Sequence, residues 1–386
     1  MYMSLLRRIS HFFKLDVYVA YLGDFSFQIG PPSSMKSLSE LLSEIYKVEV
    51  TNNLRKKIES TNENSQNDAV AAGKSNTLWR FNIKKKAVKY ARLYCFLRIL
   101  RFFVLLLLFN LKCNFLQLVN KGLVVVITQP FYFPIINRGH VVYIRRANEP
   151  LGKVLEKGVK GYLEKRFYDW VVKRVVYLVP INRQSPGCVI PNHFDVENHY
   201  LNYPSAMSSL HVTGTWNYRK GADRVASVIE NLPFQLRSRA CVYGGLGLDD
   251  NINELVVSLG DCYKGIVAEP FKHYVVGDIF LSLSRLEGFQ RSMAEALLQG
   301  CLVVAVSRPD SRYIEDYPGV FIVDKGKEFS FEECAEFIEE LFSMPIEERV
   351  TLGEKNRERA IEDMGRDSIL AAWKSVLDDV MEQSND

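Results

Sequence analysis

The segment GDIFLSLSRLEGFQRSMAEALLQGCLVVAV (Gly277–Val306) decides the fold. Its apolar run Ile279–Leu283 predicts a buried strand, Met293–Gln299 predicts a helix, and Cys301–Val306 predicts a second buried strand. A strand, a helix and a further strand in this order are the repeating unit of a parallel sheet. Ligands bind such sheets beyond the carboxyl ends of the strands, so the loop before Met293 is the first place to expect a site.

The same alternation extends over the rest of the chain. In the C-terminal half it predicts further strands at Ser209–Thr213, Ala240–Tyr243, Gly265–Val267 and Val320–Val323, helices at Ala222–Asn231 and Asn251–Leu259, and three closing helices near 330–343, 346–363 and 367–382. In the N-terminal half it predicts strands at Asp16–Leu22, Gly122–Ile127, His140–Arg145 and Val175–Pro180, and helices at Lys36–Val50, within Trp79–Leu118 and at about Lys153–Lys173. Two rounds of alternation predict an α/β protein with two Rossmann-like, doubly wound parallel sheets.

The boundary between the two rounds of strand–helix alternation lies where three prolines cluster, at Pro186, Pro191 and Pro204. We therefore expect an N-terminal domain over 1–190 and a C-terminal domain over 191–365. The helix within 366–386 is expected to pack back on the N-terminal domain.

Composition excludes several classes of protein. Of 386 residues, 47% are hydrophobic and 24% are charged, which is typical of a globular chain. The seven cysteines form no C-x-x-C pair, so a disulfide scaffold is not expected and a reducing compartment is. The chain contains no D-x-D and no His, Asp and Glu cluster with metal-ligand spacing, and the GGLG at Gly244–Gly247 lacks the full dinucleotide-binding spacing. No cofactor and no metal is expected.

Charge is distributed unevenly. Ala69–Asn148 contains no Asp or Glu but fourteen Lys or Arg, which favours an anionic partner. An anionic membrane surface is one candidate, whereas nucleic acid is not expected because no known reading module is present. The run Phe102–Phe109 (FFVLLLLF) is too short to span a bilayer. It either dips into lipid or, as we favour, packs under the N-terminal sheet. With no signal peptide at the start, the chain is expected in the cytoplasm, with the inner face of the membrane as a further location.

Two loops at strand ends carry the candidate chemistry. Lys220 precedes a predicted helix after strand Ser209–Thr213, and a lysine beside a helix N-terminus suits a phosphate. Glu287 and Glu295 flank the backbone amides of Gly288–Arg291 at the start of the next helix. Two acceptors around a group of N–H donors suit a nucleotide sugar, with hydroxyls at both ends and phosphates between. Alternatively, Ser292 and Glu295 form an S-x-x-E capping box.

In this arrangement the sequence resembles a family 4-like glycosyltransferase (group 1) of the GT-B fold. The resemblance rests on four stretches: VIPNHFD (Val189–Asp195), GTWNYRKGAD (Gly214–Asp223), Gly277–Val306 and PGVFIVD (Pro318–Asp324). It implies two Rossmann-like domains facing across a cleft, a nucleotide-sugar donor, and transfer with retention and without a metal.

The resemblance also implies roles for individual residues. Lys220 and Glu287 carry catalysis, Lys220 on the donor diphosphate and Glu287 on the donor sugar, while Glu295 holds the ribose. The implied donor-binding set is Gly214, Thr215, Arg219, Lys220, Glu287, Gly288, Phe289, Gln290, Arg291 and Glu295. Gly30, Arg145 and Arg146 are the implied acceptor-binding residues.

Two positions depart from the family pattern. Thr215 stands where the family usually has an arginine, which Arg219, Arg285 or Arg291 would have to replace, and Arg145 or Arg146 stands where many members have a histidine. The sequence therefore leaves two main hypotheses: a retaining transferase that uses a glycan or lipid-linked acceptor in surface polysaccharide synthesis, and a non-catalytic GT-B protein that binds a nucleotide sugar or a partner transferase. A membrane-surface scaffold is a third.

Overall fold

The structure is a computed structural model that describes residues 17–20, 31–50, 104, 107–108, 110–127, 140–145, 174–178, 188–204, 208–247, 249–308, 311, 313–325 and 328–382. The chain divides into two compact units. The first comprises Met1–Ile144, Lys157–Val175 and Val376–Asp386, and the second comprises Arg145–Glu156 and Val176–Ser375.

The first sheet has the strand order β2-β1-β3-β4-β5-β6. Its strands are β1 (Val17–Ala20), β2 (Val48–Val50), β3 (Val124–Ile127), β4 (Val141–Arg145), β5 (Arg174–Tyr177) and β6 (Cys188–Val189). β3 is buried along its whole length, as expected of a central strand covered on both faces. Helix α2 (Pro31–Leu42) connects β1 to β2, and Tyr46 after it donates a 2.5 Å hydrogen bond to Asp378 near the C-terminus.

The second sheet has the order β12-β11-β10-β7-β8-β9, and all its described pairs are parallel. The strands are β7 (Leu210–Thr213), β8 (Ala240–Tyr243), β9 (Tyr263–Gly265), β10 (Ile279–Ser282), β11 (Leu302–Ala305) and β12 (Val320–Ile322). The helices that follow or connect them are α6 (Ala222–Asn231), α7 (Phe234–Arg237), α8 (Asp250–Val257), α9 (Arg291–Leu298), α10 (Phe331–Ser343), α11 (Ile346–Met364) and α12 (Arg366–Glu382).

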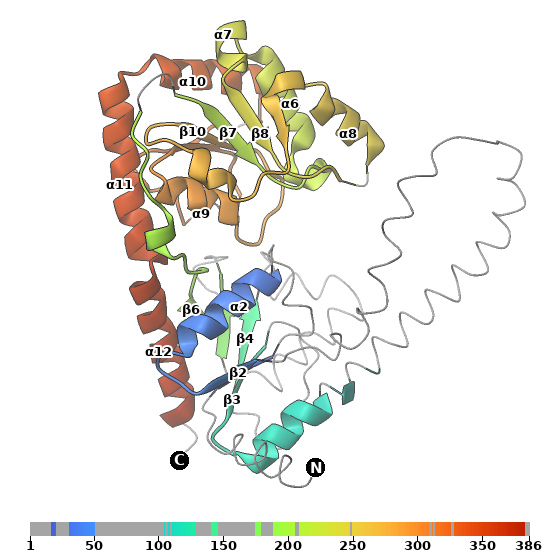
Figure 1. The fold of residues 1–386 in the computed structure, drawn as a ribbon, viewed down its shortest axis with the longest axis vertical. Helices are drawn as coiled ribbons and strands as arrows, with labels where there is room; N and C mark the ends of the chain where they lie inside the picture. The colour runs from blue at the N-terminus through green and yellow to red at the C-terminus, as the bar shows by residue number, and fades with distance from the viewer. Residues whose placement is uncertain are drawn as a thin grey trace, which may run out of the picture. The chain divides into compact units, whose positions relative to one another are not determined.

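Each face of the second sheet has its own apolar core, because alternate residues of a strand point to opposite faces. Ile279 and Leu281 of β10 lie in one core with residues of α6, α8 and α10. Phe280, between them, lies in the other core with residues of α9 and α11. Figure 1 shows α6 and α9 on opposite sides of β7, β8 and β10. A parallel sheet covered by helices on both faces is the doubly wound arrangement that the sequence predicts.

Several elements differ from the prediction. The helix predicted over Lys36–Val50 begins earlier, at Pro31, and the last three residues of that range form β2. Proline suits the first turn of a helix because the N–H that it lacks has no acceptor there. β9 lies two residues before its predicted position and ends at Gly265. The strand does not continue to Val267 because Gly265 has a positive φ of 70°, outside the extended region. β6 and α7 were not predicted, and the helix predicted at about Lys153–Lys173 lies outside the described residues.

The expectation that Phe102–Phe109 packs under the sheet is wrong for the three of its residues that are described. The side chains of Val104, Leu107 and Leu108 are 48%, 60% and 43% exposed. Residues 110–119 continue as a helix whose other face is buried at Cys113 and Leu116. No helix within the described ranges is both long enough and apolar enough to cross a membrane.

Candidate functional site

The turn between β7 and α6 fixes the position of Lys220. After β7 the chain forms a short 3-10 turn, Tyr218–Lys220, in which the Asn217 side chain accepts a hydrogen bond from the Lys220 N–H at 3.0 Å. Gly221 follows with φ at 70°, and a Cβ there would lie 2.2 Å from the carbonyl oxygen of Leu283. Glycine is therefore required where this turn meets the end of β10, and the close approach brings Lys220 to the loop after β10.

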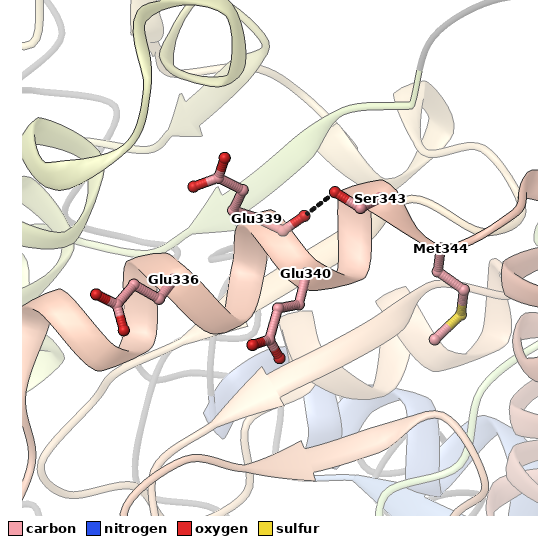
Figure 2. A pocket seen from close by; sticks show the side chains of 5 residues that line it. All are labelled: Glu336, Glu339, Glu340, Ser343 and Met344. Carbon is pink, nitrogen blue, oxygen red and sulfur yellow. Dashed lines mark hydrogen bonds between the residues drawn. The ribbon is translucent and has the colours of Figure 1, made fainter.

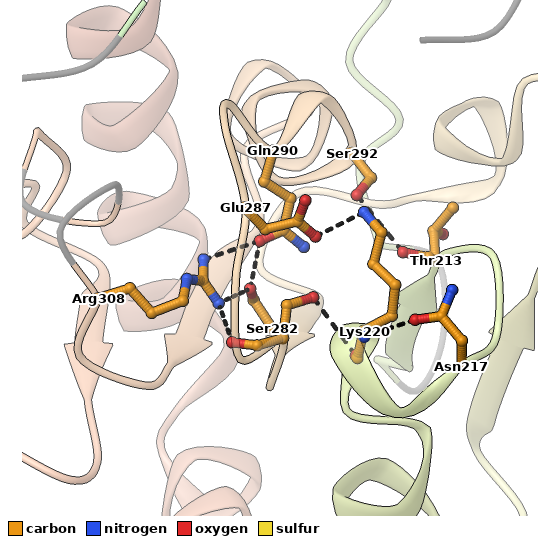
Figure 3. A network of polar contacts seen from close by, with 9 residues as sticks. Thr213, Asn217, Lys220, Ser282, Glu287, Gln290, Ser292 and Arg308 are labelled. Carbon is orange, nitrogen blue, oxygen red and sulfur yellow. Dashed lines mark hydrogen bonds and ion pairs between the residues drawn. The ribbon is translucent and has the colours of Figure 1, made fainter. Parts of the chain in front are cut away.

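Lys220 and Glu287 form an ion pair. The Nζ of Lys220 lies 2.5 Å from Oε1 of Glu287, although the residues are 67 positions apart in the chain. The Glu287 side chain is 6% exposed and the Lys220 side chain is 22% exposed. Figure 3 shows the two side chains reaching toward each other from the turn before α6 and the loop after β10. The sequence predicted a site at this edge of the sheet, and the structure brings these two residues together there.

Helix α9 begins next to this pair without a side-chain cap. Gln290 is its N-cap residue, yet its side chain makes no capping bond. Instead, Gln290 Oε1 accepts hydrogen bonds from Ser282 at 2.5 Å and from Arg308 at 3.0 Å. The first N–H groups of a helix have no acceptor within the helix, and the helix dipole favours negative charge there. An anion placed at the start of α9 would meet these groups together with the ammonium of Lys220.

Glu295 lies within α9 and is not part of a capping box. The hydroxyl of Ser292 donates to the carbonyl oxygen of Thr213 at 3.4 Å, and α9 is capped from Gln290. Burial raises the pKa of Glu295 to about 7, against the opposing charge of Arg291 at 3.7 Å. The capping-box alternative is therefore wrong, and Glu295 is a largely buried carboxylate, with 18% of its side chain exposed and the guanidinium of Arg291 near it.

The cations that could replace the arginine missing at Thr215 lie in different surroundings. Thr215 itself is exposed. Arg285 binds both carboxylate oxygens of Asp223, at 2.7 and 2.6 Å, and its guanidinium lies 3.7 Å from the centre of the Tyr218 ring. Arg285 is thus neutralised by its own partner. Arg219 is exposed in the same turn as Lys220.

The remaining donor-binding residues lie around the start of α9. Arg291 is its first residue, and its guanidinium lies 4.8 Å from the centre of the Phe194 ring. Phe289 stacks on Phe194 and on Tyr313. Gly288 is in the loop before α9, and Gly214 donates its N–H to the carbonyl oxygen of Tyr243 at 3.1 Å. These contacts fix the walls of the site, and only the cations and the free helix end are suited to phosphates.

The proposed acceptor residues are Gly30, Arg145 and Arg146. Gly30 and Arg146 lie outside the described residues, and for Arg145 only the backbone, at the end of β4, is described.

Arg308 is a residue of this site that the sequence analysis missed. It is 4% exposed and donates to Ser282 Oγ at 3.3 Å, to the Ser284 carbonyl oxygen at 2.9 Å and to Gln290 Oε1 at 3.0 Å. Figure 3 shows its guanidinium between the strand end and the loop that carries Glu287. Its position just after β11, the strand next to β10, was the available signal, because neighbouring parallel strands end at the same edge.

A pocket elsewhere in the second unit is less suited to a nucleotide. It has a volume of about 570 Å³ and is lined by Glu336, Glu339, Glu340, Ser343 and Met344 of α10 and its end. Figure 2 shows the three carboxylates along this helix, with the Ser343 hydroxyl bonded to the Glu339 carbonyl oxygen. Three acidic side chains would repel a diphosphate, so the site around Lys220 remains the better candidate.

Comparison with known proteins identifies the fold. No protein-family model matches the chain, and no curated protein matches it in sequence. Among solved structures, it is similar to WaaG, a glycosyltransferase involved in lipopolysaccharide biosynthesis, with a TM-score of 0.57 and 14% identity over 94% of this chain and 99% of WaaG. It is also similar to HepE of Anabaena in complex with UDP and glucose, with a TM-score of 0.63 and 12% identity over 95% and 100% of the two chains.

A third similar structure is a mutant of S. aureus TarM in complex with fondaparinux, alpha-GlcNAc-glycerol and UDP, with a TM-score of 0.51 and 18% identity. The match covers 67% of this chain and 55% of TarM, so the chain spans about half the length of that protein. At such low sequence identities these similarities establish the fold alone. The resemblance found in the sequence is confirmed at that level: the chain has a GT-B architecture built from two Rossmann-like parallel-sheet units.

Proposed function

We propose that this protein is a retaining glycosyltransferase that moves a sugar from a nucleotide-sugar donor to a glycan or lipid-linked acceptor in surface polysaccharide synthesis. The domain over 191–365 binds the donor. The domain over 1–190 binds the acceptor through Gly30, Arg145 and Arg146.

One observation carries the proposal: the ion pair between Lys220 and Glu287 stands beside the uncapped start of α9. A donor diphosphate needs cations and N–H donors, whereas a sugar needs hydroxyl acceptors. Lys220 and the first amides of α9 supply the former, and the carboxylate of Glu287 supplies the latter. Glu295, further along the same helix, is the acceptor for the ribose hydroxyls.

The chemistry follows from where charge develops. Breaking the bond between sugar and phosphate leaves negative charge on the departing diphosphate. Groups that are already positioned around that charge stabilise the transition state, and each well-placed donor contributes on the order of 3 kcal/mol. Lys220 and the dipole of α9 fill this role, so the reaction proceeds without a divalent metal and with no protein nucleophile.

The solved structures supply independent support for the ligand class. HepE and TarM were both solved with UDP, HepE also with glucose and TarM also with glycans, and WaaG acts in lipopolysaccharide biosynthesis. A donor of the nucleotide-sugar class and a glycan acceptor are therefore the first compounds to test on this chain.

The test is transfer and donor hydrolysis by the full chain across a panel of nucleotide sugars. Lys220→Ala is expected to lower turnover by roughly a hundredfold, the equivalent of about 3 kcal/mol of lost transition-state stabilisation. Lys272→Ala is the matched control, since Lys272 is 56% exposed and pairs with Glu269 on another turn. EDTA is expected to leave turnover unchanged. Near wild-type transfer by Lys220→Ala would remove the proposed site.

A second candidate, a GT-B protein that binds a nucleotide sugar or a partner transferase without turnover, is favoured by Thr215. At that position the site lacks a cation, and Arg285 is bound to Asp223. Two results together would favour this alternative. A nucleotide sugar would bind the chain in calorimetry, and no donor in the panel would be hydrolysed or transferred to any acceptor.

We further propose that the transferase works in the cytoplasm, on the inner face of the cytoplasmic membrane. Leu108, Leu111, Phe115 and Leu118 recur at intervals of three and four residues, so they share one face of a helix, and each is between 43% and 58% exposed. An exposed apolar face in a chain with an acid-free, basic stretch suits binding to anionic lipid.

Vesicle co-sedimentation tests this location. The full chain is expected to bind vesicles that contain phosphatidylglycerol, to bind less at high salt, and not to bind pure phosphatidylcholine. Phe115→Ser is expected to weaken binding, whereas Phe234→Ser, at a 78% exposed phenylalanine on α7, is the matched control. No binding to the anionic vesicles at low salt would exclude this location.

A further inference from the structure

A row of three chemically distinctive side chains crosses the second sheet away from the donor site. His211 lies on β7, and its register partner on the neighbouring strand β8 is Cys241. On the other side of His211, Asp278 stands directly before β10, which also pairs with β7. Cys241 and His211 therefore lie on adjacent strands, and Asp278 stands at the start of the next strand on the other side of His211.

Hydrogen bonds fix the orientation of the histidine ring. Nε2 of His211 lies 2.8 Å from Oδ2 of Asp278, and both residues are 2% exposed. Asp278 is itself held by the N–H groups of Ser209 at 2.8 Å and Val275 at 2.9 Å. With its carboxylate held as an acceptor, Nε2 carries the proton of the neutral ring, which leaves Nδ1 as an acceptor.

Nδ1 of His211 is buried and has no hydrogen-bond partner among the described residues. Cys241 is the register partner of His211 on the neighbouring strand, so the two side chains lie next to each other on one face of the sheet, and the nearby His211 lowers the pKa of the Cys241 thiol. Tyr274 stacks on the His211 ring at 4.4 Å and holds it in its plane. Cys241 is partly exposed as a residue, whereas His211 is buried.

We propose that Cys241 is a nucleophilic thiol, activated by His211 and Asp278, and that it is the site at which peroxides modify this protein. A carboxylate, an imidazole and a thiol in sequence form a proton-accepting chain like those that activate nucleophiles in enzymes. The inference is independent of sugar transfer, since none of the three residues belongs to the donor site.

In the proposed modification, hydrogen peroxide oxidises the thiol of Cys241. The thiol proton moves to Nδ1 of His211, and the sulfur attacks one oxygen of hydrogen peroxide. A sulfur–oxygen bond forms, the oxygen–oxygen bond breaks, and the departing hydroxide takes the proton from His211 to become water. The sulfur is oxidised by two electrons to a sulfenic acid, and the peroxide is reduced.

The ionisation of the cysteines agrees with this assignment. Burial opposes ionisation of Cys241, but the effect of the nearby His211 outweighs it, so the pKa of this thiol lies below 9. Burial instead raises the pKa of Cys113 and of Cys334 to about 12, and it raises the pKa of Cys262 and Cys301 as well. Low pKa combined with access is what makes a cysteine reactive.

The first test is alkylation of the full chain by iodoacetamide at pH 6.5, followed by mass spectrometry of each cysteine peptide. Cys241 is expected to react faster in the folded protein than in the same chain unfolded in urea, by up to roughly tenfold for each unit of lowered pKa. Shielding alone would make the folded thiol slower than the unfolded one. A slower folded reaction would therefore overturn the proposal.

Variants separate activation by His211 from mere exposure. His211→Gln is expected to abolish the acceleration at Cys241, whereas His273→Gln, at an exposed histidine in the turn before β10, is expected to preserve it. Wild-type reactivity in His211→Gln would overturn the proposal.

If His211→Gln does not fold, the pH profile of wild-type labelling gives the same answer. The half-maximal rate at Cys241 is expected at a lower pH in the folded than in the unfolded chain. The groups around it are His211 on β7, Tyr243 on its own strand, Lys264 on β9, Asp278 before β10, and His273 and Tyr274 at the turn before β10. A half-maximal pH in the folded chain at or above the unfolded value would overturn the proposal.

The peroxide step has its own readout. After treatment with an equimolar amount of hydrogen peroxide, dimedone is expected to label Cys241 as the main sulfenic acid of the protein. Dimedone adducts that are absent from Cys241, or that lie mainly on other cysteines, would count against it as the site of oxidation.

Discussion

Lys220 and Glu287 neutralise each other across 2.5 Å, between the turn before α6 and the loop after β10. A diphosphate that bound Lys220 would compete with Glu287 for the ammonium group. When the ammonium turns to the diphosphate, the carboxylate oxygens of Glu287 become free to accept other hydrogen bonds. The same carboxylate is the proposed acceptor for donor sugar hydroxyls. In the proposed function, the ion pair holds both groups in place, and a bound donor would place Lys220 on its diphosphate and Glu287 on its sugar.

The ion pair is expected to contribute to stability as well as to binding. Lys220→Met leaves a carboxylate that is 6% exposed without its cation, and we expect a loss of about 1–3 kcal/mol in the free energy of unfolding. Adding Glu287→Gln to this variant is expected to restore part of that loss, since the unpaired charge is removed. Urea unfolding of both single variants and of the double variant measures the coupling between the residues.

The control is Arg359 on α11, which is 56% exposed and pairs with Glu362 at 3.5 Å and with Asp363 at 3.0 Å. Arg359→Ala is expected to change stability by less than about 1 kcal/mol, as is usual for exposed ion pairs. If Lys220→Met were as mild as Arg359→Ala, the ion pair would not persist in solution.

Glu295 makes stability depend on pH in a defined direction. Burial raises its pKa from 4.5 to about 7, so between these values the folded protein keeps a proton that the unfolded chain has lost. Stability must then fall as the pH rises through this window and stay level above it. Glu295→Gln removes this cost, and it is expected to stabilise the protein by at most about 3 kcal/mol at pH 8 and hardly at pH 5.

Thermal or urea unfolding of the wild type and Glu295→Gln at pH 5 and pH 8 checks this. Glu340→Gln, on the exposed side of α10, is the matched control and is expected to have the same small effect at both values. An equal effect of Glu295→Gln at pH 5 and pH 8 would show that Glu295 is ionised throughout.

The second sheet was predictable because its apolar runs and turn residues are local signals. β8 and α6 have the predicted bounds, and each of the other strands of this sheet overlaps its prediction. The errors also have local causes. The helical spacing was recognised only from Lys36, whereas α2 begins at Pro31, where proline is tolerated in a first turn. β6 has only two residues, too few to show a period.

The site was less predictable, because its decisive contacts join distant parts of the chain. Strand ends placed Lys220 and Glu287 at one edge of the sheet, but only the structure shows their ion pair. Arg308 acts through Ser282, Ser284 and Gln290, which lie 18 to 26 residues before it. The periodicity of a sequence does not indicate which distant residues form hydrogen bonds. For the same reason, the ion pair between Arg285 and Asp223 could not be predicted from the sequence.

Arg308 is a positioning residue for the loop that carries Glu287. Arg308→Ala removes donors to the Ser284 carbonyl and to the Gln290 side chain, and we expect a loss of about 2–4 kcal/mol in stability. Arg308→Lys keeps the charge but not the two-sided geometry, so an intermediate loss is expected. Amides of 284–290 are expected to exchange hydrogen faster in both variants, and the KM for the donor is expected to rise.

Exchange in α10, on the other face of the sheet, serves as the internal control. A merely structural role of Arg308 would accelerate exchange in α10 and in 284–290 alike. An effect confined to 284–290, together with a raised KM, is the outcome that positioning predicts.

Two glycines with positive φ separate backbone strain from steric contact at this site. Gly221 has φ at 70° and would place a Cβ 2.2 Å from the Leu283 carbonyl oxygen, whereas Gly260 has φ at 58° and open space around its Cβ. Gly260→Ala is expected to cost about 1 kcal/mol, which is the strain of the left-handed conformation alone. Gly221→Ala must in addition push the turn away from β10, and a cost of roughly 3 kcal/mol or more is expected.

Because Lys220 is the preceding residue, Gly221→Ala also draws the ammonium away from Glu287, and donor affinity measured by calorimetry should fall in this variant but not in Gly260→Ala. Equal donor affinity in the two variants would mean that Lys220 does not need this turn to reach the donor.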